Sequence, residues 1–388
     1  MSPVPTPLIT TTDLYKPSNN RMKFTCTQEN LTHGLSAVSR VASKSAVLAI
    51  LNNVLLIAEE GRVQLQTTNL ELAISVVIRA KVDEPGRYTV PSKLLTDFIS
   101  LLGNERVTLE TAEGGLNVVS GHTQTTIKGT AAEDFPVLPT HEATSETTVP
   151  ATTLRDALEG TVFAAANDES RPEISGTLLS LGEKTGVLVA TDSYRLAEKK
   201  FTTLSTLSTD KKIILPSRTA QELLRLTPDD DTVVTIAVGE DQARFHFQET
   251  EIVSRVIEGQ YPDYQQIIPS TWITKVSCDQ EELLANVRAT SLFCKAGIND
   301  ITFDVQPDKK QIELRAANTQ LGEHVATVAA TIEGPATSSI FNFRYLLDGI
   351  QSLGGPQTTI EMQDHNAPAV LRNPKRDDAL YLLMPIRQ

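Results

Sequence analysis

Hydrophobic residues follow two different periods along the chain after residue 22. In segments 62–66, 75–78 and 302–306 apolar and polar side chains alternate, which is the two-residue period of a strand with one buried face. Other segments place apolar residues three, four or seven positions apart and so line one face of a helix. Turn sequences such as 59–61 and 113–115 separate the strands. The pattern predicts an α+β fold of antiparallel sheets and a few helices.

Six helices are predicted, in two groups of three. Helices of the first group follow a short strand and carry the apolar residues Leu31, Leu35 and Val38; Leu154, Leu158 and Val162; Leu283, Leu284 and Val287. Helices of the second group follow the related phrases 88–93, 213–218 and 340–344. Their apolar residues are Leu94, Leu95, Phe98 and Ile99; Leu223 and Leu224; Leu346, Leu347 and Ile350.

These phrases recur at a nearly constant interval. Lys93 and Arg218 are 125 positions apart, and Arg218 and Arg344 are 126 apart. Asp-Phe-Pro at 134–136 returns as Gln-Tyr-Pro at 260–262, again 126 positions later. Repetition over a domain-sized interval predicts three similar domains, each with two helices on one side of antiparallel sheet.

We place these domains at 22–142, 143–271 and 272–388, within the usual size of a domain with its own core. Residues 1–21 contain four prolines, a run of three threonines and no apolar stretch long enough for a signal peptide. We expect them to form a disordered N-terminal extension, and Met22 is a candidate alternative start.

Composition narrows the classes of function. Cys26, Cys278 and Cys294 form no Cys-x-x-Cys motif, which fits a reducing compartment or no redox role. No stretch approaches the roughly 18 apolar residues of a membrane span, so we expect a cytoplasmic protein. The net charge of −13 argues against tight electrostatic binding of a phosphate backbone.

Catalytic motifs are weak. Gly-Glu-Lys-Thr at 182–185 resembles the end of a phosphate-binding loop but lacks its glycines. The six histidines show no metal-ligand spacing, and Ser193 lacks the glycines of a nucleophile elbow. We predict no catalytic residue, no metal and no cofactor, and we favour a binding protein over an enzyme.

Four segments resemble a known family. They read Thr-Asp-Ser-Tyr-Arg-Leu-Ala, Glu-Gly-Gln-Tyr-Pro-Asp-Tyr, Phe-Asn-Phe-Arg-Tyr-Leu-Leu-Asp and Tyr-Leu-Leu-Met-Pro-Ile-Arg, at 191–197, 258–264, 341–348 and 381–387. They are similar to segments of the bacterial DNA polymerase III beta subunit, the sliding clamp. The resemblance covers 22–388.

The resemblance implies an assembly and partners. Two such chains join head to tail into a ring of six domains, with helices lining a central hole and sheets outside. The homodimer encircles duplex DNA and tethers the replicative polymerase alpha subunit, the clamp loader and other proteins with a clamp-binding motif. Closing the ring pairs sheet edges that an open arc exposes. The chain would be a non-catalytic processivity subunit.

The resemblance also implies a peptide slot between the second and third domains. It would accept a glutamine followed by leucine and a terminal leucine or phenylalanine. Its walls would be Ile174, Thr191, Tyr194, Arg195, Leu196, Pro262, Ile267, Asn342, Tyr345, Pro368, Leu382, Met384, Pro385, Ile386 and Arg387. Two apolar anchors at about 1.5 to 3 kcal/mol each, less ordering costs, suggest affinity on the order of micromolar. The alternative for Leu382, Met384 and Ile267 is ordinary core packing.

Basic residues on or near the predicted helices are candidates for the DNA-facing hole. They are Arg40, Lys44, Arg155, Arg171, Arg218, Arg225, Arg288 and Arg344. The alternative for any one of them is an ordinary solvated helix charge. Weak contacts suit a protein that slides.

The expected dimer interface departs from the family pattern. Its residues are Thr125, Ile127, Ser291, Leu292 and Lys295. Thr125 and Ile127 are only partly apolar, and Lys295 lacks the usual neighbouring glutamate, which puts the strength of closure in doubt. Ser193 and Tyr194 stand where many relatives have glycine and histidine, so the floor of the slot is expected to be narrower or more aromatic. An enzyme with an unrecognised site and a peptide-binding scaffold that does not encircle DNA are the competing functions.

Overall fold

The computed structural model describes residues 21–42, 48–136, 145–166, 168, 170–207, 209–295 and 297–387. The chain divides into two compact units, the first comprising 1–148 and 232–255 and the second 149–231 and 256–388. Among the predicted features, residues 1–20 of the extension and the candidate Lys44 lie outside the described residues. The second predicted domain, 143–271, contributes elements to both units.

The first unit contains antiparallel sheets and the helices α1 and α2. Its elements are β1 (Lys23–Thr27), α1 (Gln28–Val38), β2 (Asn53–Glu59), β3 (Arg62–Thr68), β4 (Leu72–Arg79), β5 (Lys81–Glu84), β6 (Gly86–Pro91), α2 (Ser92–Ser100), β7 (Arg106–Ala112), β8 (Gly115–Ser120), β9 (Thr123–Ile127), β15 (Val233–Val238), β16 (Gln242–Phe247) and β17 (Thr250–Arg255). One sheet has the order β5-β1-β7-β8-β9, and another contains the run β15-β16-β17-β4-β3-β2-β6. Because β17 pairs with β4, strands of the second repeat extend the sheet of the first.

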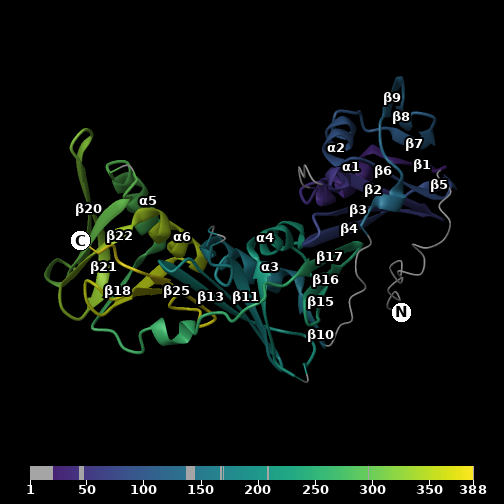
Figure 1. The fold of residues 1–388 in the computed structure, drawn as a ribbon. Coiled ribbons are helices and arrows are strands. Elements are labelled where there is room, and N and C mark those ends of the chain that lie inside the picture. Colours follow the sequence, from purple (N-terminus) through teal and green to yellow (C-terminus); the bar gives the residue numbers. More distant parts are fainter. Residues whose placement is uncertain are drawn as a thin grey trace. The chain divides into compact units, whose positions relative to one another are not determined.

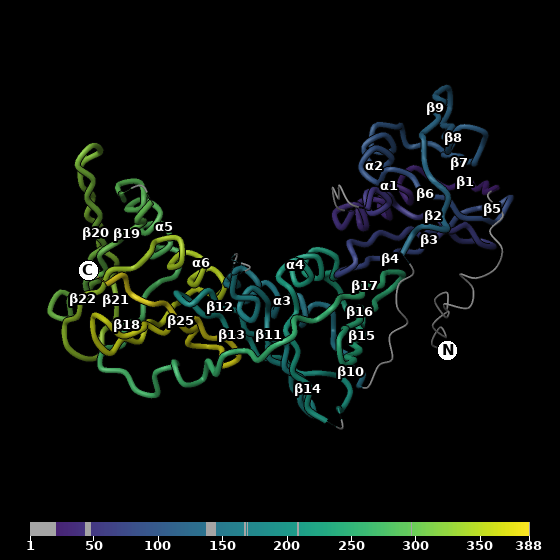
Figure 2. Tube along the Cα trace, viewed as in Figure 1, coloured from purple at the N-terminus to yellow at the C-terminus, as the bar shows by residue number. Residues whose placement is uncertain are grey.

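The second unit contains the other four helices of the described chain. Its elements are α3 (Ala151–Glu159), β11 (Gly176–Leu181), β12 (Thr185–Thr191), β13 (Arg195–Thr202), β14 (Lys211–Pro216), α4 (Ser217–Leu226), β18 (Thr274–Asp279), α5 (Gln280–Ser291), β19 (Asp300–Gln306), β20 (Gln311–Asn318), β21 (Gly322–Glu333), β22 (Thr337–Asn342), α6 (Phe343–Leu353), β23 (Gln357–Met362), β24 (Ala369–Arg372) and β25 (Ala379–Leu383). Its sheet has the order β14-β11-β12-β13-β25-β24-β23-β18-β21-β20-β19-β22. Here β13 pairs with β25, which joins the second repeat to the third (Figure 2).

The six predicted helices are confirmed. α1, α3 and α5 directly follow β1, β10 (Ser145–Pro150) and β18, whereas α2, α4 and α6 directly follow β6, β14 and β22. Pro91, Pro150 and Pro216 stand immediately before α2, α3 and α4, where the missing backbone donor costs nothing. The helices form three adjacent pairs, α1 with α2, α3 with α4 and α5 with α6 (Figure 1).

Most apolar residues that predict the helices form the cores of the units. Leu31 and Leu35 of α1 and Leu95 of α2 are fully buried. Two predictions were wrong in detail. Leu94 is 54% exposed and faces away from the core. Val162 does not continue α3, because a 3-10 turn, η4 (Val162–Ala164), follows the end of that helix.

Candidate functional site

A tight turn after β12 presents Tyr194 and orients Arg195. The hydroxyl of Thr191 donates to the carbonyl of Arg195 (2.6 Å) and accepts from the amide of Ser193 (3.1 Å). The Asp192 carboxylate accepts from the amides of Tyr194 (2.9 Å) and Arg195 (3.0 Å). Ser193 has a φ of +76°, so its backbone is left-handed. Tyr194 is 64% exposed.

The guanidinium of Arg195 ties this turn to two helices. It donates to the carboxylates of Asp192 (3.0 Å) and Asp348 (2.5 Å) and to the carbonyl of Phe163 (2.8 Å). It also lies 4.3 Å from the ring centroid of Tyr345. Its side chain is only 10% exposed. Arg195 is therefore a partly desolvated charge that connects β13 with η4 and α6.

The end of β25 lies beside this turn. Leu196 on β13 lies opposite Leu382 on β25, and both side chains are buried. Beyond the strand, the amide of Met384 donates to the carbonyl of Tyr194 (2.9 Å). Met384 itself is half-buried against the apolar cluster that contains Leu196 and Leu382. The chain end is thus held beside the turn with one apolar side chain partly open to solvent.

The structure places the remaining slot residues at different depths. Buried members are Ile174, Thr191, Leu196, Leu382 and Pro385; half-buried members are Arg195, Asn342, Tyr345, Pro368, Met384 and Ile386; exposed members are Tyr194, Pro262, Ile267 and Arg387. Burial makes Leu382 a core residue, which was the alternative interpretation for it. Asn342 caps α6 by accepting from the amide of Arg344 (3.0 Å). Near Ile267, it is Ile268 that packs against the apolar cluster.

Two partners of Arg195 on other elements were not predicted from the sequence. Phe163 lies in η4, and Asp348 lies in α6, within the segment that resembles the family. Asp348 was therefore visible in the motif, although its role was not. The contact with Phe163 uses a backbone carbonyl, which any residue supplies, so no sequence signal marks it.

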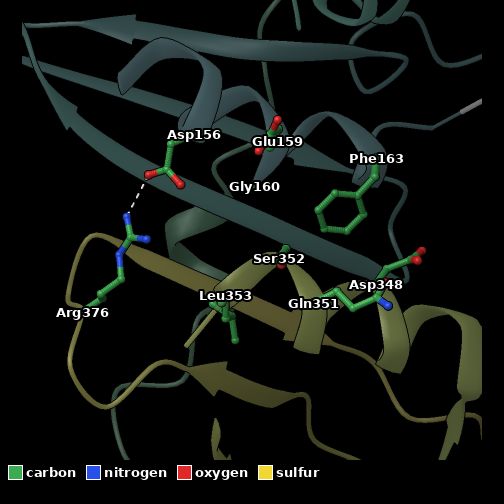
Figure 3. Close-up of a pocket in the computed structure, with 10 residues that line it drawn as sticks. Asp156, Glu159, Gly160, Phe163, Asp348, Gln351, Ser352, Leu353 and Arg376 are labelled. Atoms are coloured by element: carbon green, nitrogen blue, oxygen red, sulfur yellow. Dashed lines mark hydrogen bonds and ion pairs between the residues drawn. The ribbon is translucent and has the colours of Figure 1, made fainter. Parts of the chain in front are cut away.

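A cavity of about 430 Å³ lies next to the Arg195 cluster and shares Phe163 and Asp348 with it (Figure 3). At its edge Arg376 pairs with Asp156 (2.8 Å). Lys199, whose side chain is 4% exposed, pairs with both Asp156 (2.9 Å) and Asp378 (3.2 Å). Burial alone raises the pKa of both carboxyls, but hydrogen bonds from Arg376 and Lys199 hold each pKa below its ordinary value.

Acid is expected to weaken this four-residue network. Because the folded-state pKa values of Asp156 and Asp378 lie below the ordinary 3.8, their stabilisation is complete above about pH 4 and is lost as the pH falls through the lower values. The test compares urea midpoints of the chain and of Asp156→Asn/Asp378→Asn at pH 7, 4 and 3. The difference between the two proteins should shrink below pH 4, and a constant difference would contradict the assignment.

The candidate DNA-facing residues have different surroundings. Arg155 donates to the carbonyls of Leu224 (3.1 Å) and Thr227 (3.0 Å) at the end of α4. Arg225 pairs with Glu222, and Arg171 donates to the hydroxyl of Ser193 (2.9 Å). The exposed candidates are Arg40, Arg171, Arg218, Arg288 and Arg344. Arg155 and Arg225 are half-buried and take part in contacts within the fold.

The candidate interface residues lie on β9 and at the end of α5. β9 is an edge strand, with Thr125 half-buried and Ile127 4% exposed. Leu292 is 72% exposed, Lys295 is exposed and Ser291 is half-buried. An edge strand leaves backbone groups available for pairing with another chain.

Groups that would indicate other chemistry are few in the described ranges. Histidine, cysteine, aspartate and glutamate side chains there form no cluster that could hold a metal ion. No helix within the same ranges has the length and apolarity to cross a membrane. Burial raises the pKa of Cys26 and Cys278 to about 12 and that of Cys294 to about 11, so these thiols stay protonated at neutral pH.

Known proteins match the chain along its length. Models of the N-terminal, central and C-terminal domains of the DNA polymerase III beta subunit match residues 22–139, 148–263 and 265–387. The beta sliding clamps of Synechocystis sp. and Synechococcus elongatus are 30% and 32% identical to it, over 94% of this chain and 99% of theirs.

Solved structures show the same fold. A sliding clamp from Pseudomonas aeruginosa bound to griselimycin has a TM-score of 0.89 at 27% identity, covering 95% of this chain and 100% of that one. The C. crescentus beta sliding clamp with polyethylene glycol bound to a putative beta-motif tethering region also has a TM-score of 0.89 at 27% identity, covering 95% and 99%. The fold is that of the bacterial sliding clamps. The chain belongs to the DNA polymerase III beta subunit family.

Proposed function

We propose that two copies of this chain close head to tail into a ring around duplex DNA and confer processivity on the replicative polymerase without catalysing a reaction. One observation carries the proposal. The three domains of the family match three stretches of the chain, and each stretch contains one pair of helices joined to antiparallel sheet. The relatives are named beta sliding clamps. A cytoplasmic location follows from this role, and 22–142, 143–271 and 272–388 are its three repeats.

In this function the surface around Tyr194 and Met384 is a peptide slot. The partly open side chains of Met384 and Ile267 supply apolar walls, while the buried Leu196 and Leu382 support them from below. Slots for peptides are mostly apolar with a few polar groups, which fits this set. A polymerase or clamp-loader segment with glutamine and two apolar anchors is the proposed ligand. The tethering region named for the C. crescentus clamp supports this location only by similarity.

For DNA we propose that the exposed Arg40, Arg218, Arg288 and Arg344 carry the weak contacts of sliding. Arg155 and Arg225 are less suitable because they are half-buried. For ring closure we propose pairing through β9, with Leu292 as an apolar contact because it is 72% exposed. Cutting a loaded circular plasmid tests this function, since only a protein held by topology leaves through the new ends.

A further inference from the structure

The turn after β3 repeats the turn after β12 bond for bond. The hydroxyl of Thr68 donates to the carbonyl of Leu72 (3.1 Å) and accepts from the amide of Leu70 (3.0 Å). The carboxamide oxygen of Asn69 accepts from the amides of Glu71 (3.1 Å) and Leu72 (2.7 Å). Leu70 has a φ of +77°, matching the +76° of Ser193. Residues 68–72 therefore correspond to 191–195 one by one.

The neighbouring strand repeats as well. The amide of Arg255 donates to the carbonyl of Glu71 (2.8 Å), as the amide of Met384 does to that of Tyr194 (2.9 Å). Leu72 lies opposite Ser254, as Arg195 lies opposite Leu383. Arg255 thus holds the position of Met384 in the first unit.

Two further correspondences follow from the strand register. Val253 precedes Arg255 by two positions, as Leu382 precedes Met384. Gln242 lies opposite Arg255, and continuing the pairing of Leu383 with Ala369 places Pro368 opposite Met384. The first unit therefore contains a counterpart of the candidate slot, built from different side chains.

This counterpart is a real cavity, of about 270 Å³. Its lining includes Leu70, Leu72, Val253, Gln242 and Arg255. Leu70 is 51% exposed, so an apolar surface is open to solvent at the rim. The lining thus combines apolar side chains with the carboxamide of Gln242 and the guanidinium of Arg255, and it also includes Glu71.

The two polar groups lack partners of their own. Gln242 is only 9% exposed, and its side-chain amide, which makes no hydrogen bond within the described residues, is still reached by solvent. Arg255 is exposed and, in the same part of the chain, its guanidinium forms no ion pair. The amide of Gln242 is therefore accessible to a ligand, and a guanidinium binds carboxylates strongly.

We propose that this cavity is a second peptide site, which binds a short extended segment carrying an apolar side chain next to a carboxylate. The apolar side chain would lie against Leu70 and Val253, the carboxylate would pair with Arg255, and Gln242 would bond the peptide backbone, since its amide both donates and accepts. The inference rests on the proposed slot at Tyr194 and Met384. Arg255 and Gln242 occupy the positions that Met384 and Pro368 hold in the slot at Tyr194 and Met384. This difference gives the second site a preference for acidic segments that the first slot lacks.

Titration of the full chain with a fluorescein-labelled peptide, Gly-Ser-Asp-Leu-Leu-Gly-Ser, tests the site by anisotropy. Arg255→Glu is expected to weaken binding about tenfold or more, whereas Arg255→Lys should stay within about threefold because it keeps the charge. Leu70→Gly should weaken binding about fivefold while preserving the turn, since glycine accepts a positive φ without strain. Replacing aspartate by lysine in the peptide should abolish binding.

Three results would overturn the proposal: no saturable binding, binding that is unchanged in Arg255→Glu, or binding that is lost in Met384→Asp while Arg255→Glu retains it. The last result would place the peptide in the other slot. A second labelled peptide with glutamine, leucine and phenylalanine reports on the slot at Met384 in parallel, so failure of that slot is distinguishable from failure of this one. Sedimentation of the unliganded chain and of Arg255→Glu tests whether a second copy of the chain occupies the site. Assemblies of equal size in the two proteins exclude a second copy as the occupant.

Discussion

Replacing Arg195 by alanine is expected to lower the free energy of unfolding by about 3 kcal/mol, because it leaves two carboxylates without their cation in a partly desolvated cluster. The side chain is 10% exposed and bonds Asp192, Asp348 and the Phe163 carbonyl at the same time. Urea unfolding monitored by circular dichroism measures the loss.

Arg195→Lys is the matched control for this prediction. Lysine keeps the charge but cannot reproduce the forked contacts or the stacking on Tyr345, so an intermediate loss is expected. The Arg195 cluster would not be the structural centre of the site if the alanine variant unfolded within about 0.5 kcal/mol of the original chain.

Deleting residues 384–387 is expected to weaken binding of a glutamine-leucine-phenylalanine peptide by about a hundredfold or more, while the assembly of the chain persists. The deletion removes the partly open Met384 and two backbone bonds, from Met384 to Tyr194 and from Ile386 to Ile340. Loss of one well-buried apolar contact of about 3 kcal/mol corresponds to that factor. Anisotropy titration gives the affinity, and sedimentation gives the assembly.

Two variants complete this test. Met384→Ser removes the apolar wall but keeps the backbone bonds, so it should account for most of the loss. Asp377→Ala, an exposed change in the preceding loop, should bind as the unaltered chain does. Unchanged affinity in the deletion would remove the peptide site from this end of the chain.

Local signals explain why the helices and their order could be predicted from the sequence. A proline before three of the helices and apolar residues at helical spacing act within a few residues, so they are visible in one sequence. The turn at 191–195 was visible as a motif for the same reason. Leu94 was misplaced because the whole run 94–99 is rich in apolar residues, and periodicity alone does not decide which of them faces water.

Contacts between distant segments could not be predicted. Arg376 and Asp156 are 220 positions apart and meet only because β13 pairs with β25. The second cavity could not be predicted, because Gln242 and Arg255 resemble neither Pro368 nor Met384. Strand register determines which residues of the two sites correspond, and the sequence alone does not show that register.

Retention on DNA tests the central claim most directly. The full chain is loaded onto nicked circular plasmid with a bacterial clamp loader, and the plasmid is separated from free protein by gel filtration before and after cutting with a single-site nuclease. A ring held by topology stays with the circle at about 0.5 M salt, sediments as a dimer when free, and leaves the plasmid after the cut, since contacts with phosphates would be screened at that salt concentration. A protein that never co-elutes with the circle, or that remains bound equally to circle and linear DNA, would contradict the clamp.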